Sequence, residues 1–363
     1  SLLKSADRIV MPRELPLAEI KKIIDSGIKV EVFVHGALCL SYSGLCLFSS
    51  FVSNRSGNRG SCAQLCRQKY NGSYPLSTKE LCLVRRIPEL IKAGISGFKI
   101  EGRMRSPLYV AVATRLYRKA IDSFMDGKFA APQKEMAEIE VVFNREFTEG
   151  FTCGDNNLIS PEKPMNRGAF LGVVEKGEIA LQRPLAAGDG VGIWSEKNVT
   201  GAVIKEIVLN GKKVISAAAN ETVNPGFRAK DGSRVYLTSS AGIRIEPDFT
   251  IKRPPVTVRE RKKVNIVLPE VAPGKARPLS LLVKVYSMAE ARESLQAGAD
   301  MVFYNIFAPD FPDKAGQEGL PFGAYLPRIM NDEQLSHAFD LLVKKNPGSI
   351  LTGNPGFISR RAE

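Results

Sequence analysis

Histidine is scarce in this chain, which has only His35 and His337 among its 363 residues. The sequence contains no His-Glu-x-x-His run, the motif that binds zinc in one large class of metalloproteases. His35 lies close to several cysteines, so catalysis by a Ser/His or Cys/His pair stays open. We nevertheless expect His35 to be a structural hydrogen-bonding residue at the end of a strand, the more common role of a lone histidine there.

Long apolar runs are also missing. None approaches the roughly 18 to 20 residues needed to span a bilayer, and the first residues do not form a signal-peptide pattern. We therefore expect a soluble protein of the cytoplasm without membrane contacts, where cysteines stay reduced. The six cysteines would form three disulfides only if the chain were secreted.

Four of the cysteines occur in one short stretch, as Cys39-x6-Cys46-x15-Cys62-x3-Cys66. Cysteine thiolates bind zinc or an iron–sulfur cluster, and four of them complete either kind of site. Zinc sites usually pair their ligands as Cys-x2–4-Cys, so this spacing fits zinc only in part. The Gly- and Ser-rich segments between the cysteines favour a backbone that wraps a bulky cluster and donates N–H groups to sulfur. Buried, unligated thiols are the alternative.

Positive charge is concentrated around these cysteines. Residues 55–119 contain 14 Lys/Arg against 3 Asp/Glu, a local net charge of +11 in a chain whose total is +13. Such a surface attracts the phosphates of RNA, and the attraction weakens with salt. A solvated basic face is the alternative. Tyr42 or Phe48 could stack a flipped base, although core packing is the more common role of such residues.

Strand and helix signals alternate in residues 1–130, which carry a net charge of +11. Apolar periodicity and end signals predict strands at 6–11, 30–34 and 96–100, and helices at 15–25, 79–93 and 107–124. Such alternation indicates an α/β fold with a parallel sheet or barrel, in which chemistry gathers at the carboxyl ends of the strands. This edge is where we expect Glu101, Arg103 and Arg105, with Arg13 after the first strand.

The pattern changes further along the chain. Residues 131–250, with a net charge of −2, contain β-rich runs separated by turns such as Asn210-Gly211 and Asp231-Gly232, which predict hairpins in a small antiparallel barrel or sandwich. Residues 251–280 contain five prolines and are predicted to be a linker. Residues 281–363 return to strand–helix–strand, as at the start of a second α/β barrel. Both ends of the chain are expected to be cut from something larger.

Several motifs resemble those of the collagenase-like peptidase family U32. They are Glu31-x-Phe33-x-x-Gly36-Ala37-Leu38-Cys39-x4-Gly44-x-Cys46-x-x-Ser49, Cys62-Ala63-Gln64-Leu65-Cys66-Arg67 and Phe98-Lys99-Ile100-Glu101-Gly102-Arg103-Met104-Arg105-Ser106-Pro107. Phe143-Asn144-Arg145 with Phe147-Thr148-x-Gly150 is similar to the segment that leads into the β-rich insertion of this family. The resemblance implies that residues 1–130 are the C-terminal half of a TIM-barrel-type catalytic domain, and that a partner could supply the missing half.

The family includes oxygen-independent hydroxylases of tRNA, ribosomal RNA and ubiquinone precursors, which carry a 4Fe-4S cluster and take their oxygen atom from prephenate. The resemblance therefore implies an RNA hydroxylase with prephenate as co-substrate. The implied cluster ligands are Cys39, Cys46, Cys62 and Cys66, with Cys82 as the alternative fourth ligand. A true peptidase is a second hypothesis, and a fragment that only binds RNA or a partner is a third.

Prephenate is a dicarboxylate, and arginine forks bind carboxylates through two parallel hydrogen bonds. Arg103, Arg105 and Arg13 are therefore the expected clamps. Arg103 could instead pair with Glu101 and brace the mouth of the barrel. Glu101 is expected to serve as an acid or base, or to orient Lys99.

Overall fold

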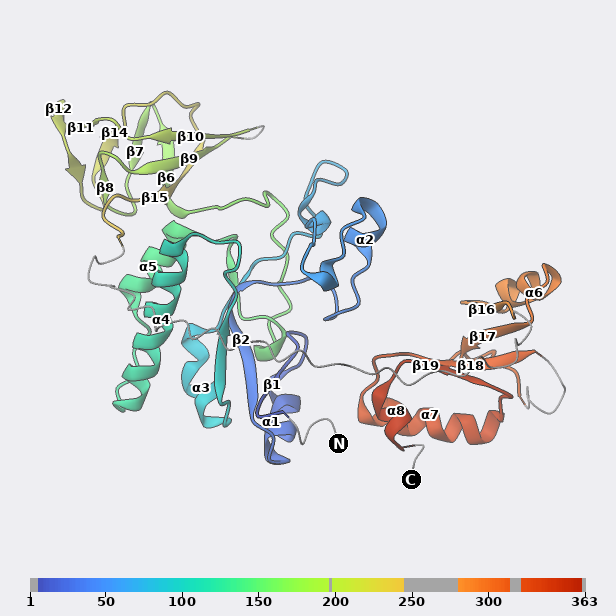
Figure 1. The fold of residues 1–363 in the computed structure, drawn as a ribbon. Coiled ribbons are helices and arrows are strands. Elements are labelled where there is room, and N and C mark those ends of the chain that lie inside the picture. The colour runs from blue at the N-terminus through green and yellow to red at the C-terminus, as the bar shows by residue number, and fades with distance from the viewer. Residues whose placement is uncertain (1–5, 196–197, 245–279, 314–320, 361–363) are drawn as a thin grey trace, which may run out of the picture. The chain divides into compact units, whose positions relative to one another are not determined.

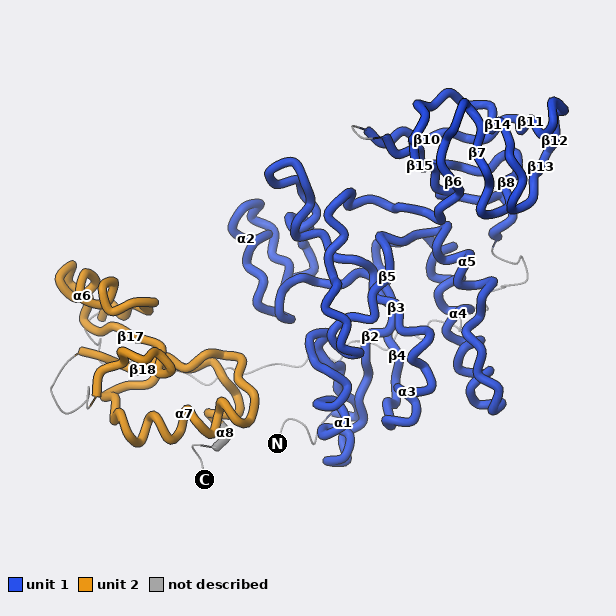
Figure 2. Tube along the Cα trace, turned by 180° about the vertical axis from the view of Figure 1, so that it is seen from behind, with its two compact units in different colours: residues 1–255 blue, residues 256–363 orange. Residues whose placement is uncertain are grey.

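The structure is a computed structural model that describes residues 6–195, 198–244, 280–313 and 321–360. It divides the chain into two compact units, residues 1–255 and 256–363 (Figure 2). The first unit contains a mixed α/β part and a β-rich part, and the second is a smaller α/β unit (Figure 1). Except for residue 280, the predicted linker lies outside the described residues. No helix of the described ranges combines the length and hydropathy needed to cross a membrane.

A five-stranded sheet is the base of the first unit. Its strands are β1 (Ile9–Val10), β2 (Val30–Ala37), β3 (Glu80–Cys82), β4 (Gly97–Ile100) and β5 (Phe147–Thr148). β2 pairs in parallel with β1 and β4 and antiparallel with β3, and β5 extends the sheet parallel to β3. Alternate residues of β2, namely Val30, Val32 and Val34, are buried in the core, as period-two patterning requires.

Four helices accompany this sheet: α1 (Leu17–Asp25), α3 (Ile87–Lys92), α4 (Pro107–Met125) and α5 (Gln133–Val142). α4 begins where the Ser106 hydroxyl accepts a hydrogen bond from the Tyr109 N–H and Pro107 occupies the first helical position. α5 lies beside α4, and its Ile139 is buried in the same core. The first core therefore includes residues beyond position 130.

The predicted strands at 30–34 and 96–100 and the predicted helices at 15–25 and 107–124 are confirmed within a few residues. The helix predicted at 79–93 is wrong in its first half, because residues 80–82 form β3 and the α-helix begins only at Ile87. The partners of β3 lie about 45 residues before it, in β2, and 67 residues after it, in β5. Tertiary pairing therefore overrides the local pattern at this position.

The β-rich part has an eight-stranded sheet in the order β10-β9-β15-β6-β7-β14-β11-β12 and a two-stranded sheet of β13 and β8. The strands are β6 (Ala169–Glu175), β7 (Glu178–Ala180), β8 (Leu185–Ala186), β9 (Gly190–Trp194), β10 (Val199–Val203), β11 (Ile207–Leu209), β12 (Lys212–Val214), β13 (Ser216–Ala217), β14 (Thr222–Asn224) and β15 (Arg234–Ser239). Asn210 and Gly211 join β11 and β12 with positive φ at both positions, which confirms that hairpin.

The hairpin predicted at Asp231-Gly232 is wrong. This turn leads into β15, whose neighbours are β6 and β9 and not the preceding strand β14. Gly232 has a positive φ of 82°, so a turn does form at this position. The strands that it connects are nevertheless separated in the sheet, which local sequence does not indicate.

The second unit is a parallel four-stranded sheet in the order β16 (Leu282–Lys284), β17 (Met301–Asn305), β18 (Phe322–Leu326) and β19 (Ile350–Thr352). Helices α6 (Met288–Gln296), α7 (Asp332–Lys345) and α8 (Pro355–Arg360) accompany it. The predicted strand–helix–strand is confirmed. α7, which was not predicted, begins with a capping box in which Asn331 and Gln334 bond each other's backbone N–H.

Candidate functional site

The cysteine-bearing segment, residues 38–79, begins at the carboxyl end of β2 and contains the short helix α2 (Phe48–Ser53) (Figure 1). Arg13 follows β1 and Glu101 follows β4, so all three parallel strands direct candidate residues to the same edge. Gly36 permits a close approach there. Its φ is +110°, and a Cβ at this position would lie 2.5 Å from the Glu101 carbonyl oxygen.

The four cysteines predicted as ligands lie near one another. Cys39 and Cys62 are exposed, whereas Cys46 and Cys66 are half-buried. Burial raises the pKa of the Cys66 thiol, Arg67 opposes this effect, and the thiols of Cys39, Cys62 and Cys46 raise the pKa further. Because such charge effects require proximity, the Cys66 thiol lies within electrostatic reach of the other three thiols.

Four thiols are the type of donor that an iron–sulfur cluster takes. Within the described ranges, no three His, Cys, Asp or Glu side chains are arranged to hold a single metal ion. The thiolates of a cluster bind different iron atoms and therefore stand further apart than the ligands of one ion. The Gln64 N–H donates a hydrogen bond to Cys62 Sγ over 3.3 Å. Backbone N–H groups that point at sulfur are typical outer-shell partners of metal-bound thiolates.

The other two cysteines have separate surroundings. Cys82 lies in β3 with an exposed fraction of 8%, and its sulfur is 3.9 Å from the Tyr117 hydroxyl. Burial raises the pKa of Cys82 to about 11. Cys153 is half-buried near Glu89 and Arg86, and burial raises its pKa to about 11 as well. The structure thus groups Cys66 with the other three cysteines and places Cys82 in the apolar core.

His35 belongs to the core of the first unit, as its 1% exposed fraction indicates. The rings of Tyr109, Tyr117 and Phe147 surround it with centroids between 5.5 and 5.9 Å away. Burial lowers the pKa of His35 to about 3, so its imidazole is neutral at physiological pH. His35 Nδ1 lies 3.4 Å from the Tyr117 hydroxyl. These contacts give His35 a structural position without access to a substrate.

Arg13 lines a pocket of about 260 Å³ at the end of β1, together with Cys39. The remaining lining residues are Glu14, Leu38, Leu40, Ser41, Tyr42 and Phe151. Arg13 Nη1 donates a hydrogen bond to the Ala37 carbonyl over 3.1 Å. Its Nε is buried and has no hydrogen-bond partner among the described residues. A ligand carboxylate in this pocket would give that N–H group an acceptor.

The other two predicted arginine clamps point elsewhere. Arg103 Nη2 donates a hydrogen bond to the Gly60 carbonyl over 2.7 Å and thereby holds the segment that leads to Cys62. Arg105 is directed to a buried group, with Nη2 3.5 Å from Glu80 Oε1. Glu101 is partly buried and forms no ion pair with any residue of the described ranges, so the alternative Arg103–Glu101 pair is not present. Of these three arginines, Arg13 lines a pocket together with the candidate ligand Cys39.

Four residues beside the cysteines were not predicted from the sequence: Arg67, Thr78, Glu80 and Arg145. Arg67 and Arg145 occur inside the quoted motifs, and their place in those motifs was the available signal. Glu80 fell within the wrongly predicted helix, where a glutamate is unremarkable. Nothing in the local sequence indicates that it is buried and surrounded by arginines.

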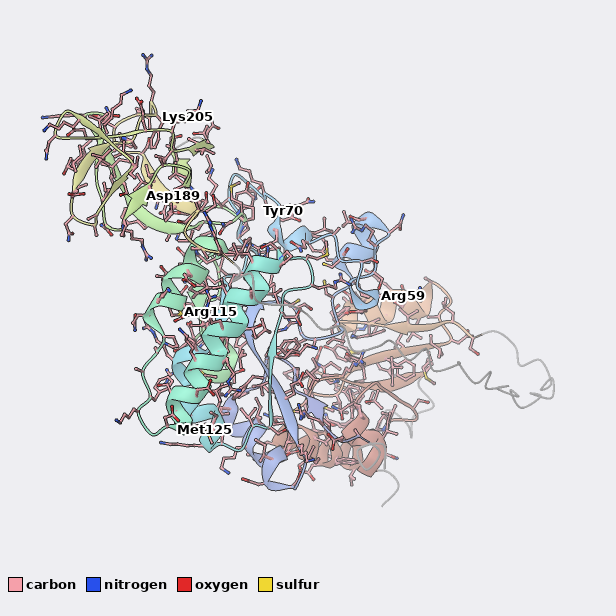
Figure 3. All side chains as sticks on the ribbon, turned by 60° about the vertical axis from the view of Figure 1, so that its left-hand side comes forward. Arg59, Tyr70, Arg115, Met125, Asp189 and Lys205 are labelled. Atoms are coloured by element: carbon pink, nitrogen blue, oxygen red, sulfur yellow. The ribbon has the colours of Figure 1, made fainter. Side chains whose placement is uncertain are left out.

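The cysteine-bearing segment also carries exposed basic and apolar side chains on its surface. Residues 32–79 contain no Asp or Glu, and Arg55, Arg59 and Lys69 are exposed (Figure 3 labels Arg59). The Phe51 side chain has an exposed fraction of 90% and that of Tyr42 54%. This combination of positive charge with exposed rings is typical of surfaces that bind single-stranded nucleic acid.

The sequence motifs agree with comparisons to known proteins. The model of peptidase family U32 matches residues 3–160. An uncharacterized protease of Methanocaldococcus jannaschii is 34% identical over 275 residues, which are 64% of this chain and 67% of that protein. This chain belongs to peptidase family U32.

The names of other relatives state different activities. A tRNA hydroxylation protein P1 of Bacillus subtilis is 37% identical over 41% of this chain and 40% of its own length. A collagenase of Porphyromonas gingivalis is 34% identical over 41% of this chain and 42% of its own length. The chain therefore spans about two thirds of the archaeal relative and about two fifths of these two.

Proposed function

We propose that this chain is part of an iron–sulfur-dependent, oxygen-independent hydroxylase of ribosomal RNA or tRNA that acts in the cytoplasm and uses prephenate as its oxygen donor. The observation that carries the proposal is the proximity of four cysteine thiols on a segment without acidic residues. Relatives named as tRNA hydroxylation proteins and as a 23S rRNA 5-hydroxycytidine synthase support RNA as the substrate class.

In this proposal Cys39, Cys46, Cys62 and Cys66 hold a 4Fe-4S cluster. A bound cluster would supply electron transfer or polarise the oxygen donor. The chain itself contributes the soft donor atoms and the Gln64 N–H that bonds Cys62 Sγ. Arg103 restrains the same loop through the Gly60 carbonyl.

Prephenate is proposed to bind in the Arg13 pocket. The unpartnered Nε of Arg13 would bind one of its carboxylates, and Leu38, Leu40 and Phe151 would contact its ring. Cys39 also lines this pocket, so the donor would lie beside the proposed cluster. Glu101, at the end of β4, remains the candidate acid or base.

RNA is proposed to bind along the cysteine-bearing segment. Arg55, Arg59 and Lys69 would contact phosphates, and the exposed ring of Phe51 would stack a base. The parallel strands β1, β2 and β4 are proposed to belong to a TIM-barrel-type domain. Further strands from a partner or from more of the chain would complete such a barrel.

A peptidase is the second candidate, and the relatives named as collagenases support it. The burial of His35 weighs against it, because a His-dependent nucleophile needs an accessible base. Purified protein that cleaves gelatin, with activity that survives Cys62→Ser, would favour the peptidase.

Mass spectrometry of RNA nucleosides tests the proposed function. RNA is compared from the source organism with the gene, without it, and with the gene restored as wild type, Cys62→Ser or Cys153→Ser. We expect one hydroxylated nucleoside to disappear on deletion and to return with the wild type and Cys153→Ser but not with Cys62→Ser. An unchanged set of nucleosides after deletion would contradict RNA hydroxylation.

A further inference from the structure

Three arginines and one glutamate form a charged group inside the first unit, here called the Glu80 group: Arg67, Arg105, Arg145 and Glu80. Glu80 has an exposed fraction of only 1%, and its Oε1 lies 2.8 Å from Arg145 Nη1 and 3.5 Å from Arg105 Nη2. Arg67 reaches the same region, because its Nη1 donates a hydrogen bond to Ser77 Oγ over 3.0 Å, three residues before Glu80.

Positive charge dominates the Glu80 group. Of all carboxylates in the described ranges, Glu80 alone forms ion pairs with these arginines. The exposed fraction of the Arg145 side chain is 8% and that of Arg105 19%, so water screens them poorly. Burial lowers the pKa of Arg145 to about 10, which still leaves it charged at neutral pH. A buried excess of charge is costly unless a counter-charge lies nearby.

The cysteine thiols are the groups placed to supply that counter-charge. Arg67 directly follows Cys66 in the chain, and its side chain is connected through Thr78 to the Leu38 carbonyl, which precedes Cys39. These contacts make two of the candidate ligands neighbours of the Glu80 group. A metal centre bound by four thiolates has a net negative charge, which the excess guanidinium charge would balance.

Hydrogen bonds also connect the Glu80 group to both parts of the cysteine segment. Arg67 Nη2 donates to Thr78 Oγ1 over 2.7 Å, and the Thr78 hydroxyl donates to the Leu38 carbonyl over 2.6 Å. Arg67 is adjacent to Cys66 and Leu38 is adjacent to Cys39. These two hydrogen bonds therefore fix the two ends of the cysteine-bearing segment relative to each other.

We propose that Arg67, Arg105 and Arg145, offset by Glu80, are positioning residues that raise the reduction potential of the centre bound by the four cysteines. The inference rests on the proposed function, because it requires the cluster. Reduction adds one electron and neither forms nor breaks a bond. Since the reduced centre is more negative than the oxidised one, nearby positive charge stabilises it more.

The test is a redox titration of the anaerobically purified full chain with dithionite as reductant, followed by electron paramagnetic resonance. The variants are Arg145→Gln, Arg105→Gln, Arg145→Lys and Glu80→Gln. Arg115→Gln is the matched control, because it removes an arginine from the ion pairs that link α4 to α5 (Figure 3 labels Arg115). Iron, sulfide and circular dichroism are measured for every protein, so that loss of the centre or of the fold is recognised.

Each glutamine replacement of Arg145 or Arg105 is expected to lower the reduction potential. The expected size is about a tenfold change in the ratio of reduced to oxidised centre, which is about 59 mV for one electron. Glu80→Gln should raise the potential, and Arg145→Lys and Arg115→Gln should leave it nearly unchanged. If one glutamine variant fails to fold, the other gives the same sign.

The inference would be overturned if the reduction potential is unchanged in the folded Arg145→Gln and Arg105→Gln variants. It would also be overturned if Glu80→Gln lowers the potential as the arginine variants do. If the wild-type protein contains iron and sulfide but the variants show no such shifts, the proposed function is unaffected. A wild-type protein without iron and sulfide would overturn both. The two failures are therefore distinguishable.

Discussion

Arg103 donates a hydrogen bond from Nη2 to the Gly60 carbonyl oxygen, 2.7 Å away. This bond connects the turn that follows β4 to the loop that precedes Cys62, although 43 residues separate the two partners in sequence. Arg103 itself is exposed, so the contact does not serve the apolar core. Its position indicates that it holds the candidate metal-binding loop against the sheet.

Replacement of Arg103 by Ala should weaken retention of the metal centre with little effect on the fold. Exposed polar contacts contribute less than about 1 kcal/mol to stability, whereas a freed loop would release its thiolate more readily. Iron per protein after dialysis against a chelator measures the first effect, and thermal unfolding the second. Arg118→Ala, which removes an exposed ion pair on α4, is the control and should retain its iron. Equal retention in both variants would contradict this role.

Arg13→Gln should weaken prephenate binding. A hydrogen bond to a charged group contributes about 1.5 to 3 kcal/mol, so the dissociation constant should rise about tenfold to a hundredfold. Isothermal calorimetry with prephenate measures this change. Arg55→Gln, which alters an arginine of the cysteine segment that does not line the pocket, should leave the constant unchanged. Equal constants for Arg13→Gln and the wild type would place the donor elsewhere.

Phe51→Ala should weaken RNA binding without loss of stability, because 90% of this side chain is exposed. Base stacking on an aromatic ring contributes about 1 to 3 kcal/mol. Filter binding of a single-stranded RNA should show this loss, and the affinity of every protein should fall as salt rises. Ile215→Ala, at a residue of the β-rich part that is 82% exposed, is the matched control. If both variants bind RNA like the wild type, stacking on Phe51 is excluded.

His35 should make the free energy of unfolding of the first unit fall as the pH is lowered. Burial lowers its pKa to about 3 from the ordinary value of 6.5, so the unfolded chain takes up the proton first as the pH falls. The contribution of neutral His35 is therefore complete above pH 6.5 and is lost progressively from pH 6.5 towards pH 3. Between pH 7.5 and 5.5 the expected loss is about 1.4 kcal/mol.

Urea unfolding at these two pH values measures that loss. His35→Phe should reduce the difference in unfolding free energy between the two pH values, because a phenyl ring cannot take up the proton. His337→Gln changes the exposed second histidine and should leave the pH dependence as in the wild type. The same pH dependence in His35→Phe and the wild type would show that His35 is not the responsible group.

The sequence predicted those elements whose ends are set by neighbouring residues, such as a helix start or a tight turn. Ser106 and Pro107 start α4 and the Asn210-Gly211 turn closes a hairpin, and both are read directly from residue type. The spacing of the cysteines predicted a group of thiols that the structure brings within electrostatic reach. β3 was missed because both of its partner strands are distant in sequence.

The Glu80 group could not be predicted for the same reason. Glu80 and Arg145 are 65 residues apart, and Arg105 points to Glu80 only because β3 lies beside β2. Sequence alone treated Arg103, Arg105 and Arg13 as equivalent clamps. Their different partners, which are Gly60, Glu80 and Ala37, follow from the way the loops pack at the edge of the sheet.

Cys39, Cys46, Cys62 and Cys66 are proposed to hold one iron–sulfur centre. The most direct test is the iron and sulfide content, with the visible absorption spectrum, of the anaerobically purified chain and of its six single Cys→Ala variants. We expect iron and sulfide in the wild type, in Cys82→Ala and in Cys153→Ala. Both should be lost when Cys39, Cys46, Cys62 or Cys66 is replaced. A colourless wild-type protein, or one whose iron is independent of these four residues, would contradict the account.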